Sequence, residues 1–163
     1  MSKLITIGRV EKIGFPDFEL NGIHAKIDTG ADLSTIWATD IYEHNNVLHL
    51  KLLGPKSDHF TGEEIMVKAP NYLLTRVANS FGHKELRYVI KLKTVIAGKI
   101  INASYTLSNR STKTYSVLIG RKLLNGKFLV DVSRGEPLAE LENKKRGKMK
   151  KELEAFKMWE EAK

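Results

Sequence analysis

From Ser2 to about Val132, the hydrophobic residues come in short runs rich in Ile, Val, Leu and Tyr, separated by Gly, Asn, Asp or Pro. Short runs bounded by turn-forming residues are typical of β-strands. The pattern therefore predicts a mostly β body, in which Asn21-Gly22 and Ala97-Gly98 resemble tight hairpin connections. The expected strands cover residues 4–13, 18–27, 47–53, 64–68, 73–79, 86–97, 99–107, 116–119 and 128–130.

Beyond Pro137 the pattern changes, because hydrophobic residues recur there at helical spacing among Lys and Glu. This spacing predicts a terminal helix whose apolar stripe packs on the body or on a partner subunit. Gly147 predicts a break or a flexible entry within it. We therefore expect a β domain over residues 1–135 and a basic helical tail over residues 136–163. The stripe comprises Leu138, Leu141, Met149, Leu153, Phe156 and Trp159.

The composition, with 42% hydrophobic and 28% charged residues, is that of a soluble globular protein. No apolar run approaches the roughly 18 to 20 residues that cross a bilayer, and the segment from Met1 to Phe15 lacks the continuous apolar region of a signal peptide. We therefore expect no membrane association and a cytoplasmic location. The absence of cysteine excludes disulfides, a cysteine nucleophile and thiolate metal sites.

The formal net charge of +8 predicts a basic surface, which attracts nucleic acid, acidic lipid or acidic peptides alike. Part of the excess lies in the tail, in a run that is most often a solvated helix face. No nucleic-acid recognition motif accompanies this charge, so nucleic acid is not the partner we expect. The run comprises Lys144, Lys145, Arg146, Lys148, Lys150 and Lys151.

The main candidate for chemistry is the segment Asp28-Thr29-Gly30-Ala31, which a β-type run enters directly. An Asp followed by a small hydroxyl residue and Gly lets the chain turn sharply and leaves the carboxylate exposed at a strand end. Taken alone, the triplet more often marks an ordinary strand-ending turn with an Asx hydrogen bond. It needs a second element before it indicates an active site.

That second element is the hydrophobic run Val117-Leu118-Ile119, which ends in Gly120-Arg121. Residues 121–124 favour a short helix that Asn125-Gly126 would end. Together the two elements resemble aspartic peptidases of the retropepsin class, which pair Asp-Thr-Gly-Ala with a hydrophobic-hydrophobic-Gly element. Gly8-Arg9 and the stretches 79–90 and 107–131 resemble the bacterial branch of that class. The resemblance covers most of the first 135 residues.

The resemblance implies a retropepsin-like acid-protease fold, a closed barrel, and a role for each matching residue. It implies a β-hairpin flap around residues 76–87 that closes over a peptide substrate. It also implies an ion pair between Asp32 and Arg121, although many bacterial members carry Arg where this chain has Asp32. The implied catalytic residues are Asp28, Thr29 and Gly30; the substrate contacts are Ala31, Asp32, Ser80, Phe81, Gly82 and His83; Leu118, Ile119, Gly120 and Arg121 support the site.

The bacterial family is often labelled an ATP-dependent zinc protease, and it is associated with ATP-grasp glutamate ligases that modify a ribosomal protein. A zinc peptidase needs about three protein ligands, usually with a His-Glu-x-x-His motif. The five histidines here are scattered, and no Gly-rich loop ends in Gly-Lys-Ser/Thr to hold phosphate. We therefore expect no metal site and no cofactor.

A chain of 163 residues forms one ordinary domain and is too short for two pepsin-like lobes. A two-lobed aspartic site must then come from two chains, so the resemblance implies a homodimer with one Asp28 from each subunit. The predicted function is that of an aspartic endopeptidase, with acidic or glutamylated peptides suggested as substrates by the charge and the family association. The alternative is a non-catalytic regulator that binds a glutamate-ligase partner through the same groove.

Overall fold

The computed structural model describes residues 3–78 and 82–162 of the chain. As predicted, the body is mostly β. Its strands are β1 (Ile5–Ile7), β2 (Val10–Phe15), β3 (Leu20–Ile27), β4 (Ser34–His44), β5 (Val47–Leu52), β6 (Ile65–Lys68), β7 (Tyr72–Ala78), β8 (Lys84–Ile96), β9 (Lys99–Ser108), β10 (Val117–Ile119) and β11 (Phe128–Val130). The helices are α1 (Arg121–Leu124) and α2 (Ala139–Glu161), and a 3-10 turn covers Pro16–Phe18.

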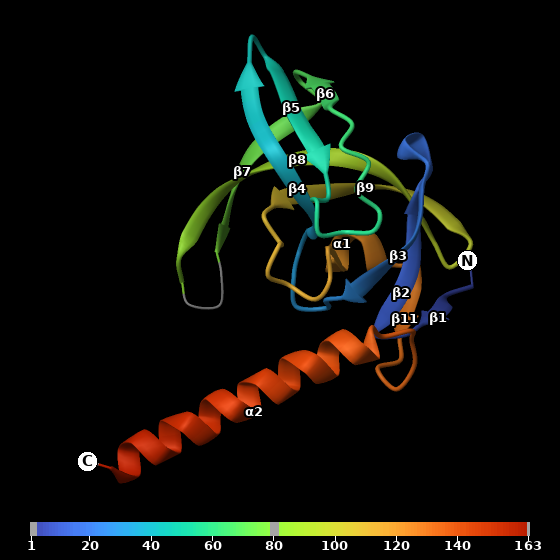
Figure 1. Ribbon diagram of the computed structural model, residues 1–163. Helices are drawn as coiled ribbons and strands as arrows, with labels where there is room; N and C mark the ends of the chain where they lie inside the picture. Colours follow the sequence, from blue (N-terminus) through green and yellow to red (C-terminus); the bar gives the residue numbers. More distant parts are fainter. Residues whose placement is uncertain (1–2, 79–81, 163) are drawn as a thin grey trace.

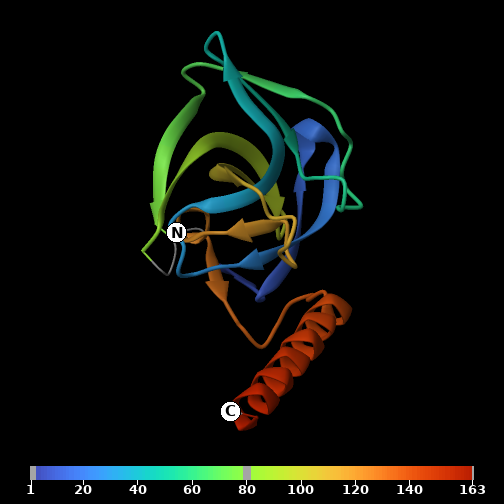
Figure 2. The same ribbon diagram turned by 60° about the vertical axis from the view of Figure 1, so that its left-hand side comes forward.

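One large sheet curves around the core of the molecule (Figures 1 and 2). Within it β3, β2, β8 and β9 are joined by antiparallel pairings, and β9 runs parallel to β4. The short strand β10 pairs with both β3 and β4, so the pairings return to the strand from which they start. β5 and β6 continue beyond β4, β7 pairs with β8, and β1 with β11 forms a separate parallel pair.

The core is filled by the inward side chains of this sheet. In β5 the residues alternate along the strand, so that Leu48, Leu50 and Leu52 are buried. Phe15 and Tyr105 meet edge to face at its centre, with ring centroids 5.5 Å apart. The Tyr105 hydroxyl lies 2.9 Å from Oγ1 of the buried Thr94, so neither hydroxyl is left unpaired.

The structure corrects the strand predictions in three places. β4 was not predicted, and the reason is that residues 34–38 are all buried, which removes the alternating pattern by which a half-buried strand is recognised. Asn21-Gly22 lies within β3, and the chain turns instead through the 3-10 segment before it. The strand expected over residues 4–13 is divided into β1 and β2. The tight turn at Ala97-Gly98 is confirmed: both residues have positive φ, 47° and 75°.

Helix α2 extends away from the body (Figure 1), and none of its residues is buried. It runs without interruption through Gly147, so the predicted break there is wrong. The apolar stripe does not pack on the body: Met149, Phe156 and Trp159 each keep more than half of their surface exposed. Packing on a partner subunit stays a prediction, as does the domain boundary at residue 135. No helix in the described part of the chain is long and apolar enough to span a bilayer.

Candidate active site

Asp28 lies one residue beyond the end of β3, where that strand runs parallel to β10. Its backbone N–H donates to the carbonyl of Ile119 at 2.9 Å. Its carboxylate oxygen Oδ1 accepts from the backbone N–H groups of Gly30 and Ala31, at 3.1 and 3.2 Å. The loop is therefore an Asx-type turn, and the same hydrogen bonds hold the carboxylate at the strand end.

The loop that carries Asp28 is joined to the start of α1 by two backbone hydrogen bonds. The N–H of Arg121 donates to the carbonyl of Ala31 at 2.8 Å, and that of Lys122 donates to the carbonyl of Asp32 at 3.1 Å. The first N–H groups of a helix lack partners within the helix, so the loop satisfies them. The two elements that the sequence singled out are thus one structural unit.

Gly120 allows this close approach. Its N–H donates to Oγ of the buried Ser34 at 3.0 Å. A Cβ atom at position 120 would lie 2.5 Å from the backbone carbon and oxygen of Leu33 and 2.9 Å from the backbone nitrogen of Ser34. Real Cβ atoms do not come that close to backbone atoms, so glycine is required here by space and not by its φ angle of −89°.

The expected ion pair between Asp32 and Arg121 is present. Both side chains keep about three-fifths of their surface exposed, at 62% and 60%. Exposed pairs of this kind contribute at most about 1 kcal/mol to stability. Thr29 and Gly30 are also exposed, next to this pair, so the tip of the loop is accessible on the surface of the single chain.

The predicted flap is a β-hairpin. β7 and β8 pair antiparallel from Tyr72 opposite Ile90 to Ala78 opposite Lys84, and the hairpin projects from the body on the side of α2 (Figure 1). Gly82 and His83 lie at its described end, whereas Ser80 and Phe81 lie outside the described residues. A cavity of about 500 Å³ separates β7 from the Asp28 loop. Residues 75–78 of the hairpin and residues 30–33 of the loop lie on its walls.

A second cavity, of about 590 Å³, opens beside Asp28 itself. Leu118 contributes to its wall, whereas Ile119 and Gly120 are buried behind it. Arg110, which no feature of the sequence marked as a site residue, also lines it. Burial and the charge of Arg87 lower the pKa of Arg110, and the nearby carboxylate of Asp28 partly offsets this. The proximity of Arg110 and Asp28 arises from tertiary packing, so no local pattern could have predicted it.

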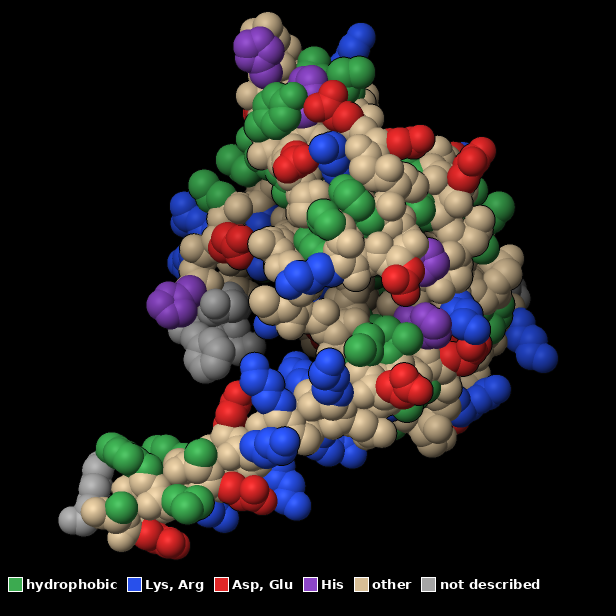
Figure 3. Space-filling view, in the orientation of Figure 1, with side chains coloured by type: hydrophobic (Ala, Val, Ile, Leu, Met, Phe, Trp, Pro, Cys, Tyr) green, Lys and Arg blue, Asp and Glu red, His purple; other side chains and the backbone are tan. Residues whose placement is uncertain are grey.

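The opposite wall of this second cavity comes from α2. In the space-filling view, Lys and Arg side chains gather along the part of α2 nearest the body, and hydrophobic side chains gather toward its far end (Figure 3). Within the described residues, no group of three or more His, Asp or Glu side chains is arranged to hold a metal ion. The residues of α2 that line this second cavity are Glu142, Lys145, Arg146 and Met149.

Curated relatives are known for this chain. The probable alpha-L-glutamate ligase of Shewanella pealeana is 30% identical over 142 residues, and that of Parasynechococcus marenigrum is 27% identical over 143 residues. These matches cover 82% and 86% of this chain but only 30% and 31% of the ligases. The chain therefore spans less than a third of the length of these relatives.

A crystal structure of a Legionella pneumophila protein of unknown function has a similar fold, with a TM-score of 0.61 and 26% sequence identity. The similarity covers 82% of this chain and 96% of that one. The family model described as retropepsin-like aspartic endopeptidase RimB matches residues 6–138, a range that contains the Asp28 loop, the flap hairpin and Gly120. This match confirms the resemblance seen in the sequence, and the chain belongs to the RimB-like family of retropepsin-like aspartic endopeptidases.

Proposed function

We propose that this protein is a retropepsin-type aspartic endopeptidase, active as a homodimer in which the two Asp28 carboxylates face each other. The observation that carries the proposal is the loop of residues 28–31, which holds a carboxylate at a strand end beside two cavities. Membership of the family supports the class of enzyme. The strand pairings that return to β10 support the closed barrel expected of this fold.

In the proposed dimer the two carboxylates share one proton, because like charges about 3 Å apart cannot both ionise cheaply. The ionised Asp28 acts as a general base on a bound water, and the protonated one donates to the scissile carbonyl. Thr29 braces the paired loops, and Gly30 presents its backbone to the substrate. The exposed position of both residues in the single chain is compatible with these roles.

The substrate in this proposal is an extended peptide that lies between the Asp28 loop and the flap hairpin. The cavity between residues 30–33 and 75–78 is a space for such a peptide, and an extended chain can pair with strand backbone there. The net charge of +8 would steer acidic or glutamylated peptides toward the protein. No metal or cofactor takes part.

The test is the Asp28→Asn variant, assayed by mass spectrometry on a glutamate-rich peptide. The amide oxygen of Asn can still accept the hydrogen bonds from Gly30 and Ala31, so the loop is preserved while its acid–base chemistry is removed. We expect cleavage to fall by roughly 10² to 10⁴-fold. Asp17→Asn is the matched control, because it removes an exposed carboxylate that lines neither cavity. Undiminished cleavage by Asp28→Asn would disprove the role of Asp28.

The names of the curated relatives favour a second function. They are named glutamate ligases, and this chain matches less than a third of their length. The alternative is therefore a non-catalytic regulator that binds a separate ligase through the same groove. Such a regulator would keep its effect on ligase activity when Asp28 is replaced by Asn. A peptidase would lose its effect, so the same variant separates the two functions.

A further inference from the structure

The cavity beside Asp28 has an excess of positive charge that the proposed chemistry does not use. Its cations come from the body and from α2, and its carboxylates are Asp28 and Glu142. Glu142 is already engaged, since Arg9 donates to both of its oxygens at 3.1 Å and the Tyr115 hydroxyl donates to it at 2.6 Å. The cationic lining residues are Lys26, Arg110, Lys113, Lys145 and Arg146.

Arg110 differs from the other four cations in its burial, because those four are exposed. It is partly buried, and its Nε donates to the carbonyl of Tyr115 at 2.9 Å. Among the described residues no carboxylate lies within 4.0 Å of its guanidinium, whereas neighbouring Arg87 pairs with Glu85 at 2.7 Å. Burying a charge is costly unless an opposite charge compensates it. The terminal N–H groups of a guanidinium match the two oxygens of a carboxylate, so this site is suited to an acidic side chain.

Tyr115 positions both walls of the cavity. Its carbonyl accepts from Arg110, and its hydroxyl donates to Glu142 and accepts from the N–H of Leu138 at 3.0 Å. These bonds, with the Arg9–Glu142 pair, fix the first turns of α2 against the body. Lys145 and Arg146 follow Glu142 within one turn of the helix and line the cavity opposite Arg110. The family match ends at residue 138, so α2 adds this wall outside the matched region.

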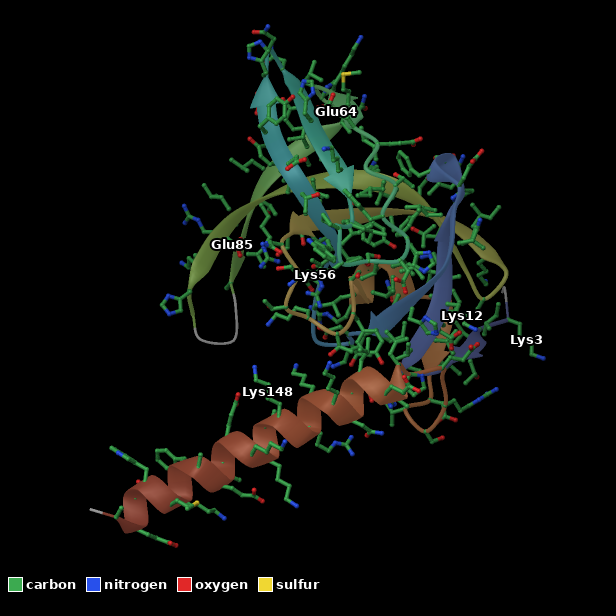
Figure 4. The ribbon with its side chains drawn as sticks, viewed as in Figure 1. Lys3, Lys12, Lys56, Glu64, Glu85 and Lys148 are labelled. Atoms are coloured by element: carbon green, nitrogen blue, oxygen red, sulfur yellow. The ribbon has the colours of Figure 1, made fainter. Side chains whose placement is uncertain are left out.

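The basic lining continues along α2 into an adjoining cavity of about 870 Å³. This cavity shares Lys113, Thr114, Lys145 and Met149 with the cavity beside Asp28. Figure 4 shows Lys148 rising from α2 toward the body, and Lys148 and Lys56 both line this larger space. Trp37 lines it as well, and its buried Nε1–H has no hydrogen-bond partner among the described residues. Because that donor is enclosed by the body, the side chains that this space offers to an acidic group are its lysines.

We propose that Arg110, Lys145 and Arg146 form a carboxylate-binding subsite next to Asp28, which selects peptides with an acidic side chain near the scissile bond. The consequence for cleavage rests on the proposed peptidase function, whereas binding of an acidic peptide does not. The cavity of about 590 Å³ lies within the range of roughly 300–1,000 Å³ that is usual for ligand sites. Helix α2 is then part of the substrate site and not only a solvated tail.

Binding is tested in the full-length Asp28→Asn protein by fluorescence anisotropy with a labelled glutamate-rich peptide and a glutamine-rich peptide of equal length. The double variant Lys145→Glu/Arg146→Glu should weaken binding of the glutamate peptide by at least about tenfold, the loss expected for charge-assisted hydrogen bonds. The matched control is Lys150→Glu/Lys157→Glu, which changes the net charge equally on residues of α2 outside this lining. It should weaken binding less than about threefold.

Two results would overturn the subsite. Equal weakening by both double variants would mean that only the overall charge matters, and no weakening by Lys145→Glu/Arg146→Glu would mean that α2 does not contact the peptide. Arg110→Lys tests the body wall, because Lys keeps the charge but loses the forked geometry. We expect it to weaken binding of the glutamate peptide and to leave binding of the glutamine peptide as it was. An unchanged affinity for the glutamate peptide would contradict the role of Arg110.

Cleavage assays separate this subsite from the proposed function. In the chain with Asp28 intact, the Lys145→Glu/Arg146→Glu variant should raise KM for the glutamate peptide more than it lowers kcat. If the protein binds acidic peptides as described but cleaves none, the peptidase function fails and the subsite stands. If it cleaves glutamate and glutamine peptides equally well and the variant changes neither, the subsite fails and the peptidase function stands.

Discussion

Replacing Gly120 by Ala should destabilise the fold through a single methyl group. The added Cβ would lie 2.5 Å from the carbon and oxygen of Leu33, which are backbone atoms and cannot turn aside as a side chain does. Overpacking of this kind costs about 1–3 kcal/mol. Moving the chain to relieve it would also strain the hydrogen bond from Gly120 to Ser34, worth about 1 kcal/mol. We therefore expect the free energy of unfolding to fall by about 2–4 kcal/mol.

Urea and thermal denaturation followed by circular dichroism measure this loss. For a chain of this size, about 2–4 kcal/mol lowers Tm by about 5–15 °C. Gly147→Ala is the control, because a Cβ there meets no atom within 4 Å and the position lies inside α2. It should leave the protein unchanged or stabilise it by up to about 1 kcal/mol. If Gly120→Ala unfolds within about 0.5 kcal/mol of the wild type, close approach does not explain this glycine.

Three further predictions concern ion pairs. Removing the Asp32–Arg121 pair with Arg121→Gln should change stability by less than about 1 kcal/mol, which thermal denaturation measures, because both side chains are largely exposed. Glu142→Gln should speed amide hydrogen exchange and tryptic cleavage in the first turns of α2, since it removes the charge that pairs with Arg9; unchanged exchange would contradict this tether. Hydrogen bonds from Arg9 and, to a smaller extent, from Tyr115 lower the pKa of Glu142. The tether is therefore intact above the ordinary Glu pKa of about 4.3 and is lost as the pH falls through the lowered pKa of the folded protein. Amide hydrogen exchange in the first turns of α2, measured at decreasing pH, detects this loss.

The Asp28 loop and its support were predictable because their chemistry is local. An Asp followed by Thr and Gly turns at a strand end whatever surrounds it, and Gly120 marks a close approach that few other residues permit. The resemblance to a known family joined these two segments, and the hydrogen bonds between them explain why they occur together. The Asp32–Arg121 pair followed from the same resemblance.

The remaining features depend on tertiary structure. The first half of β4, residues 34–38, is buried on both faces, so it lacks the alternation that marks a half-buried strand. Arg110 comes near Asp28 only because the segment after β9 packs there, and no spacing in the sequence encodes that proximity. The place of α2 depends on Tyr115 and Glu142, which look like ordinary surface residues in the sequence.

A mixing experiment tests most directly whether two Asp28 side chains form one active site. Wild-type and Asp28→Asn chains are mixed in equal amounts, allowed to exchange subunits, and assayed for cleavage of a glutamate-rich peptide. If each site needs both carboxylates, random pairing leaves about one quarter of the dimers active, so activity per wild-type chain falls to about half. Activity per wild-type chain that stays constant at every mixing ratio would contradict the shared dyad.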